Sequence, residues 1–227
     1  SLNMMMFFGS FVESSTIEQW MTSHFLELEQ NATNQEIIDP KEYNTLGVSY
    51  LNGFFQLTIE GAIYTIQIEV DPNKSCSYFK ASHKLGNELG SGLLGMLYLN
   101  GLGCDENIEL SKQLLEPVRL KYSDTASAYG IAVHKLMRTS SKHTNKVNTS
   151  FMLESLKKGA ENNQIPALNA LYQIYKEGIY TERNINLSEA YRTKAKELIN
   201  QKLKINEAMR ASQKRISLLN NTIKQES

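Results

Sequence analysis

An eight-residue pattern occurs twice in the chain and constrains its fold more than any other feature. Leu-Gly-x-x-Tyr-Leu-Asn-Gly is found at 46–53 and again at 94–101. A third copy at 171–178 keeps the leucine, the tyrosine and the final glycine, with Tyr172 in place of the first glycine. Leucine and tyrosine four residues apart lie on one face of a helix, and a glycine after the last turn ends a helix at little cost. The pattern therefore predicts a recurring helix, as stacked repeats require.

A second helix is predicted after each copy of the pattern. Asp71, Asn107 and Asn186 are suitable N-cap residues, because their side chains accept hydrogen bonds from the first N–H groups of a helix. We expect Gly86 and Gly159 to end two of these second helices. Their separation corresponds to two repeats of roughly 36 residues, within the range of helical repeat families.

These residues together resemble the SEL-like repeat family, a relative of the tetratricopeptide repeat. The family pattern is A-x-x-x-L-G-x-x-Y-x-x-G-x-G, followed by a capped second helix, and it covers about four repeats over 39–200. The third repeat, at about 123–159, is degenerate, because His134 stands at the tyrosine position. The resemblance implies an all-α fold, an α/α solenoid of antiparallel helix pairs in a right-handed superhelix. The expected structural repeat positions are Leu46, Gly47, Tyr50, Gly53, Leu94, Gly95, Tyr98, Gly101, Gly103, Ala167, Leu171, Tyr175 and Gly178.

Residues 54–70 interrupt the helical pattern. They are rich in β-branched and aromatic types, and Leu57 and Ile59 alternate with polar residues. Gly61 can take the positive φ that a tight turn needs. This stretch predicts a small β-hairpin inserted into the first repeat.

The two ends of the chain are expected to cap the array. Residues 1–38 are interpreted as an N-terminal capping helix region, with Ser15 as an N-cap. Residues 201–227 are interpreted as a C-terminal amphipathic capping helix, because stacked repeats need a polar outer end. An alternative is that this helix binds a partner. Its apolar stripe is Ile205, Met209, Ser212, Ile216, Leu219 and Ile223.

Composition does not identify the compartment, but it gives no support to nucleic-acid binding or to a membrane-spanning segment. Lys plus Arg and Asp plus Glu each number 24, so there is no basic footprint for nucleic acid. No apolar run is long enough to span a bilayer.

For Cys76 and Cys104, two buried free thiols are favoured over a bridge. The compartment stays open: periplasmic or secreted if a signal peptide has been removed, otherwise cytoplasmic.

Motifs that could support chemistry are weak in this sequence. Residues 90–95 match G-x-G-x-x-G, but a dinucleotide site needs a preceding strand, and here a helical segment precedes the glycines. The four histidines lack metal-ligand spacing. A basic loop around Arg138 is interpreted as solvated rather than as a site for an acidic partner. We therefore expect no catalytic, cofactor-binding or metal-binding residues.

The resemblance implies a protein–protein interaction scaffold that holds a protein or peptide partner on its concave face. It also implies a bacterial origin. One alternative is an immunity or effector-associated protein that neutralises a secreted toxin. A hydrolase is a weaker alternative, and a third is a structural oligomer that pairs through the helix at 203–223, although a monomer is favoured. The partner-binding residues are not identified by the sequence.

Overall fold

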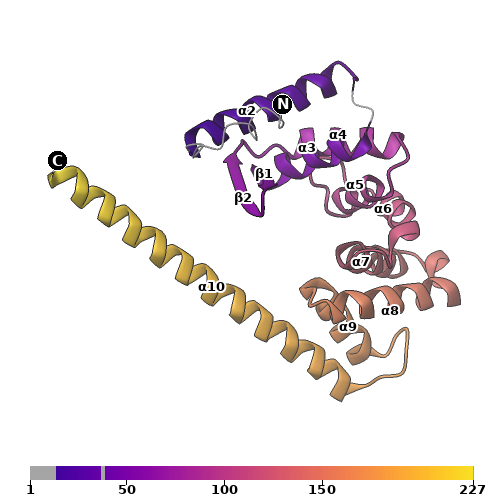
Figure 1. Cartoon of the computed structure of the whole chain (residues 1–227). Helices are drawn as coiled ribbons and strands as arrows, with labels where there is room; N and C mark the ends of the chain where they lie inside the picture. Colours follow the sequence, from indigo (N-terminus) through magenta and orange to yellow (C-terminus); the bar gives the residue numbers. More distant parts are fainter. Residues whose placement is uncertain (1–13, 37–38, 227) are drawn as a thin grey trace. The chain divides into compact units, whose positions relative to one another are not determined.

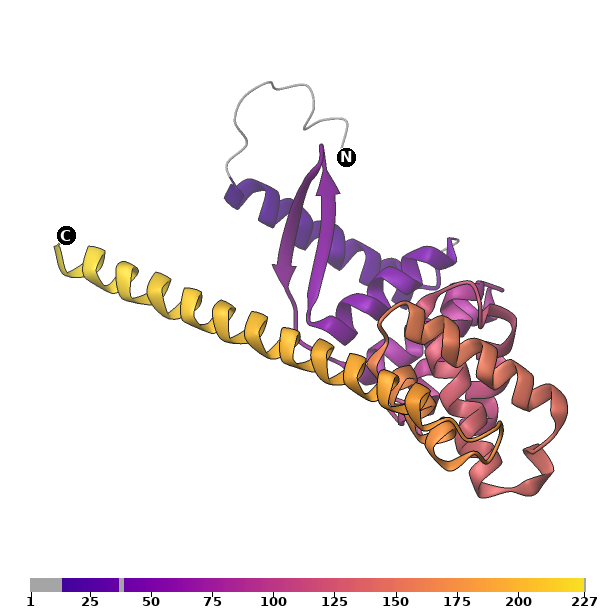
Figure 2. The same ribbon diagram turned by 90° about the horizontal axis from the view of Figure 1, so that it is seen from below.

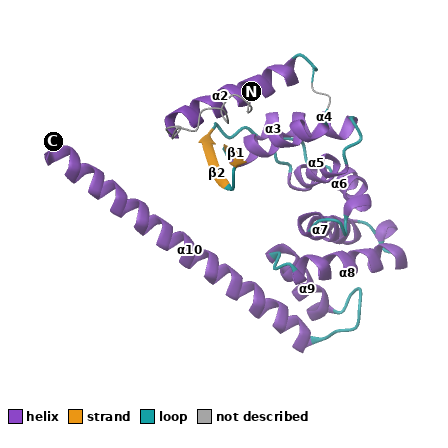
Figure 3. Ribbon diagram, viewed as in Figure 1, coloured by secondary structure: helices purple, strands orange, loops and turns teal. Residues whose placement is uncertain are grey.

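A computed structural model of the chain describes residues 14–36 and 39–226, with side chains described for 16–36 and 39–215. Helices dominate, and there is one small sheet (Figures 1 and 3). The chain forms two compact units that divide after Val118. Among the described residues, no helix is both long and apolar enough to cross a membrane.

Unit 1 contains two helix pairs, the first of which carries the sheet. Its elements are α2 (Ser14–Thr33), α3 (Pro40–Asn52), β1 (Phe54–Ile59), β2 (Ala62–Gln67), α4 (Pro72–Lys84), α5 (Glu88–Asn100), α6 (Ile108–Leu115) and the 3₁₀ turn η1 (Glu116–Val118). Helix α3 packs against α4, α5 packs against α6, and α4 joins the two pairs by packing against α5. These are the first two predicted repeats.

The ends of these helices follow the predicted chemistry. The carboxylate of Asp71 accepts a hydrogen bond from the N–H of Lys74, and the amide oxygen of Asn107 accepts one from the N–H of Leu110. At the other end of the first helix of each pair, Gly53 and Gly101 have positive φ. Glycine takes this conformation without a Cβ clash. The helix boundaries in unit 1 are therefore local in origin. Ser15, the predicted cap of the first helix, lies inside α2, which already includes Ser14, so that prediction was wrong.

The predicted hairpin is confirmed. Strands β1 and β2 pair antiparallel, with Phe54 opposite Gln67 and Ile59 opposite Ala62. Glu60 and Gly61 both have positive φ, as a two-residue type I′ turn requires. One face of the sheet packs on α2, where the ring centroids of Phe55 and Phe25 are 5.2 Å apart. Figure 2 shows α2 crossing behind the two strands.

The expectation of free thiols was wrong. Cys76, in α4, and Cys104, in the loop after α5, form a disulfide with a Cα–Cα distance of 6.0 Å. The loop approaches the start of α4 closely. Gly103 lies so near the backbone of Pro72 that a Cβ would not fit there, so only glycine allows this approach. That approach brings the two sulfurs together, and it also covers the Cys76 side chain.

Unit 2 contains two further helix pairs. Its elements are α7 (Ser123–Thr139), the 3₁₀ turn η2 (Ser141–His143), α8 (Lys146–Glu161), α9 (Ile165–Glu177) and α10 (Ile185–Glu226). Helix α7 packs against α8, and α9 against both α8 and the first part of α10. The degenerate repeat is thus still a helix pair. Its first helix lacks a terminal glycine and extends to Thr139.

Two predicted helix boundaries in unit 2 were wrong. Gly159 does not end α8 but lies inside it, where a Cβ would come within 2.9 Å of the Ala167 side chain. The glycine is there for close helix packing, and Asn163, with positive φ, follows the helix instead. The N-cap of α10 is Asn184 rather than Asn186, because its side chain accepts the hydrogen bond from the N–H of Leu187.

Helix α10 is one continuous element, so no break separates a helix at 201–227 from the last repeat. Ala195, in its first part, is buried against the unit. Every side chain from 199 to 215 is exposed. The side chains of this stretch therefore cover no apolar face, and the capping role of residues 201–227 stays a prediction. Ile216, Leu219 and Ile223 lie outside the residues whose side chains are described.

Candidate binding groove

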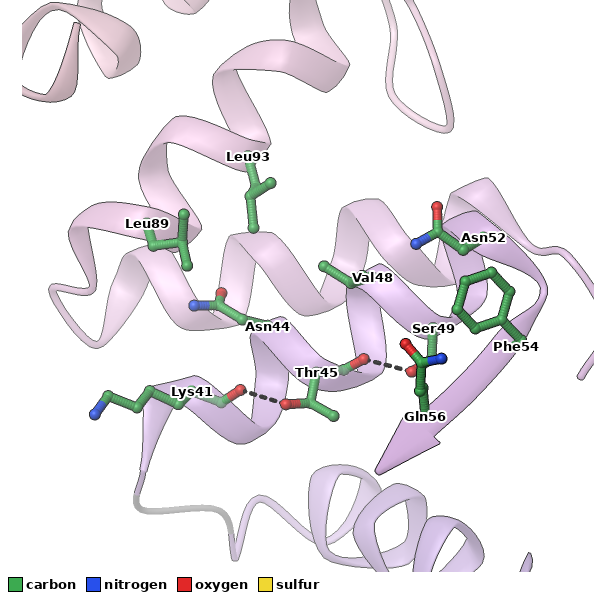
Figure 4. A pocket seen from close by; sticks show the side chains of 10 residues that line it. All are labelled: Lys41, Asn44, Thr45, Val48, Ser49, Asn52, Phe54, Gln56, Leu89 and Leu93. Atoms are coloured by element: carbon green, nitrogen blue, oxygen red, sulfur yellow. Dashed lines mark hydrogen bonds between the residues drawn. The ribbon is translucent and has the colours of Figure 1, made fainter. Parts of the chain in front are cut away.

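A groove of about 560 Å³ lies in unit 1 between α3, α5 and the start of β1. Figure 4 shows Leu89 and Leu93 projecting from α5 toward α3, with Phe54 and Gln56 at the opposite end. The groove is lined by Lys41, Asn44, Thr45, Val48, Ser49, Asn52, Phe54, Gln56, Leu89 and Leu93.

Helix α3 serves the core and the groove with different faces. Leu46 and Tyr50, two of the repeat positions, are buried in the core. Lys41, Thr45 and Val48 follow at steps of four and three and line the groove. Such steps keep side chains on one face of a helix. The repeat pattern therefore fixes the helix, and the residues between the pattern positions determine what the groove presents.

One lining residue of the groove, Asn44, is a buried amide. Asn44 is 6% exposed, and its Nδ2 donates a 2.9 Å hydrogen bond to Oδ1 of Asn87. The same Asn87 oxygen accepts a 2.8 Å hydrogen bond from the N–H of Gly90, so it caps α5 and holds Asn44 at once. The other amide atom, Asn44 Oδ1, has no hydrogen-bond partner among the described residues. This oxygen is buried close to Gly90 of α5, so it belongs to the packing of the first repeat on the second and not to the open surface of the groove.

The rest of the groove combines amides and hydroxyls with an apolar shelf. Ser49 and Thr45 donate their hydroxyl hydrogens to carbonyls one turn back on α3, at 2.7 and 3.1 Å (Figure 4). Their oxygens can still accept hydrogen bonds. Lys41 is the one charged residue in the lining.

Comparison with known proteins identifies the fold. No family model and no curated protein matches the chain by sequence. Among solved structures, the chain is similar to c5321, a protective antigen of uropathogenic Escherichia coli strains with an SLR fold, at a TM-score of 0.52 and 19% identity. The chain has an SLR fold.

The solved structures extend beyond the length of this chain. The likeness to c5321 covers 75% of this chain and 33% of that protein. A Sel1 repeat protein from Oxalobacter formigenes is similar at a TM-score of 0.48 and 15% identity, over 75% of this chain and 64% of that protein. The predicted fold class, stacked helix pairs with a small hairpin insertion, is confirmed.

The repeat positions of the SLR pattern occupy comparable places in the structure. Those in the core are Leu46, Tyr50, Leu94, Ala167, Leu171 and Tyr175, all buried. Gly47 and Gly95 let a large side chain of the second helix approach, and a Cβ on Gly95 would lie 2.8 Å from Cγ of Leu115. Gly53, Gly101, Gly103 and Gly178 have positive φ. Tyr98 departs from expectation, because it is only partly buried, and the ammonium of Lys80 lies 5.8 Å from its ring centroid.

A polar cluster ties α2 to the first repeat. Lys74 Nζ lies 3.2 Å from Oε1 of Glu29 and 3.0 Å from the hydroxyl oxygen of Tyr50, which itself donates to Glu29. Tyr78 also donates to Glu29, at 3.4 Å. Burial, with the Glu29 charge, raises the pKa of Tyr78 to about 12, and burial likewise raises the pKa of Tyr50. Both tyrosines are therefore neutral hydrogen-bond donors that anchor α2 near neutral pH.

The candidate residues for chemistry are dispersed. Gly90, Gly92 and Gly95 of the G-x-G-x-x-G stretch lie inside α5, which follows another helix rather than a strand. His134 is buried, with its ring edge-on to Tyr180 at 5.7 Å. Burial lowers its pKa, with Arg138 contributing. In the part of the chain that the structure describes, no group of three His, Cys, Asp or Glu residues is placed to hold a metal.

The groove itself was not found from the sequence. Asn44 and Asn87 are far apart in the chain, and their pairing depends on how the first repeat stacks on the second. One signal was present: α3 carries a polar stripe of Lys41, Thr45 and Asn52 beside its apolar repeat positions. A polar stripe usually marks a solvated helix face, so it did not single out a groove.

Proposed function

We propose that this protein is a scaffold that holds an extended segment of another protein in the groove between α3, α5 and β1. The observation that carries the proposal is the composition of the groove. Five of its side chains are amides or hydroxyls beside an apolar shelf of leucines and Val48. Lys41 is the single charged side chain of this lining.

The SLR fold supports the same class of function. Helical repeat proteins of this fold serve in general as protein-interaction scaffolds, because stacked helix pairs present extended binding surfaces. In this chain the inserted hairpin adds Phe54 and Gln56 to the groove. The insertion thus contributes to recognition at a place where the regular repeat has only a short loop.

The expected partner segment is extended and carries little charge. Amide and hydroxyl groups pair with the N–H and C=O groups of a peptide backbone, and the leucine shelf accepts small apolar side chains. With Lys41 as the single charge of the lining, affinity depends weakly on salt.

The disulfide suggests the compartment in which this scaffold works. Disulfides form and persist in oxidising environments and are rare in the reducing cytosol. The bridge between Cys76 and Cys104 therefore supports an exported protein. The role of an immunity protein against a secreted toxin stays a prediction.

Selection of random linear peptides on the immobilised protein tests the proposal. The expected outcome is a family of uncharged peptides that bind saturably, compete with one another, and are recovered unchanged after incubation. Enrichment of no peptide family, or release of cleaved peptide, would contradict a scaffold that binds through this groove.

A further inference from the structure

We infer that the exposed part of α10, residues 199–215, is a second interaction surface that docks an acidic amphipathic helix of a partner protein. The surface is in unit 2, on an element that contributes nothing to the groove. Binding at this surface would not depend on the groove, because the two surfaces share no residue.

The surface continues an interface that already exists. In the first part of α10, Ser188 and Ala195 are buried against the unit, and Tyr191 stacks on Tyr175 of α9 at 5.9 Å. The hydroxyl of Ser188 donates a 2.9 Å hydrogen bond to the carbonyl of Tyr172. These residues are three and four positions apart. They form one stripe along the helix, and α9 covers it.

The same spacing runs on past the end of α9. We call Leu198, Lys202, Ile205, Met209 and Ser212 the α10 seam, because their steps alternate between four and three. The sequence keeps these steps through Ile216, Leu219 and Ile223. A stripe with this alternation is the narrow seam by which two helices pair in a coiled coil.

The seam is uncovered beyond Leu198. Ile205 and Met209 are 58% and 57% exposed. Helices obtain most of their stability from packing an apolar stripe against other elements. A long helix whose stripe is open is therefore a surface prepared for a partner.

The charges of this stretch select among partners. Residues 199–215 carry five cations, Lys202, Lys204, Arg210, Lys214 and Arg215, against Glu207. A second copy of the chain would place this excess against itself, and in a parallel pair Lys202 would face Lys202. An acidic helix would instead complement both the flanks and the lysine in the seam, which is how charged positions choose partners in coiled coils.

The composition of the stripe argues against a lipid surface. A helix that lies in a membrane interface has a broad apolar face with tryptophan, phenylalanine or leucine. Residues 199–215 contain no aromatic residue. Ile199 and Leu203 are exposed beside the seam, but the seam itself contains Lys202 and Ser212, so its apolar surface is interrupted. An acidic helix is therefore the occupant that the observations favour.

The test uses the full chain and two synthetic heptad peptides with the same leucine seam, one flanked by glutamates and the other by lysines. Fluorescence anisotropy of the labelled peptides is expected to show saturable binding of the glutamate peptide, at least roughly tenfold tighter than the lysine peptide and weakened by salt. Equal affinity for both peptides, or no binding of either, would overturn the inference.

Matched variants locate the binding site. Replacing Ile205 and Met209 together by serine is expected to weaken binding of the glutamate peptide by about tenfold or more. The control variant carries the same replacement by serine at Leu26 and Val147, which are 57% and 60% exposed on other helices. It should bind the glutamate peptide as the parent does. Circular dichroism confirms that both variants keep their helices.

Two further measurements separate the other occupants. Sedimentation that shows a dimer lost in the Ile205→Ser, Met209→Ser variant would assign the seam to a second copy. Flotation with phosphatidylserine vesicles, lost in the same variant and without peptide binding, would assign it to a membrane. Either result overturns the inference. Binding of the glutamate peptide to α10 is expected to depend strongly on salt, whereas peptide binding in the groove is expected to depend on it weakly. The two proposals can therefore fail separately.

Discussion

The backbone N–H of Asn107 donates a 2.9 Å hydrogen bond to the carbonyl of Tyr98. The same bond joins Asp71 to Tyr50 and Asn184 to Tyr175 at the same distance. In each case the N-cap of the second helix is tied to the repeat tyrosine of the first. The first repeat keeps this closure although a whole hairpin is inserted between the two residues. The insertion therefore extends the repeat without opening it.

Removal of the hairpin tests this closure. Replacing residues 54–70 by a copy of residues 102–106, with serine in place of the cysteine, should leave α3 and α4 protected in hydrogen exchange. Helix α2 should lose protection, because Phe55 no longer packs on Phe25. Selected peptides should also bind more weakly, because Phe54 and Gln56 are gone from the groove. Loss of protection in α3 and α4 as well would contradict a closure independent of the hairpin.

Gly95 is expected to be intolerant of a side chain. A Cβ there would lie 2.8 Å from Cγ of Leu115 and 3.2 Å from the carbonyl oxygen of Ser111. Gly95→Ala should lower the free energy of unfolding by about 1–3 kcal/mol, measured with urea. Adding Leu115→Ala should cost less in this background than in the parent chain. Strict additivity of the two changes would show that the close approach is not what requires the glycine.

The disulfide should stabilise unit 1. Replacing Cys76 and Cys104 by serine is expected to cost about 2–4 kcal/mol in urea unfolding. A reducing agent should destabilise the parent by a similar amount and leave the variant unchanged. Titration of free thiols on the unfolded, unreduced parent should find none. Two titratable thiols would contradict the bridge.

His134 should make unit 2 sensitive to acid. Burial and Arg138 hold its pKa below the ordinary value of 6.5, so the unfolded chain binds the proton more readily than the folded chain. Above pH 6.5 the imidazole is neutral in both states, and the free energy of unfolding is at its full value. This free energy falls as the pH drops from 6.5 to the lower pKa of the folded state. His134→Asn should flatten the dependence of urea stability on pH over this range. An unchanged pH profile in the variant would assign the acid sensitivity to other groups.

The sequence predicted the helix pairs well, because the signals that define the helices are local. The positions of Leu46 and Tyr50 follow from helical spacing, and Gly101 follows from the φ that only glycine takes cheaply. Asp71 and Asn107 cap helices with their own side chains. Features of this kind need no knowledge of the rest of the chain.

What the sequence did not predict depends on contacts between distant segments. Cys76 meets Cys104 only because Gly103 approaches the start of α4. Asn44 meets Asn87 only because one repeat stacks on the next. Gly159 resembled a helix end, but close packing on Ala167 accounts for it. The binding groove belongs to this second group, so it became visible only in the structure.

The affinity of one selected peptide for two valine variants tests the central claim most directly. Val48 is 37% exposed in the groove, and Val147 is an exposed valine on α8 in the other unit. By calorimetry, Val48→Glu should weaken binding by about tenfold or more, because it places a charge on the apolar shelf. Val147→Glu should bind as the parent does. Equal affinity of the two variants would contradict binding in the groove between α3, α5 and β1.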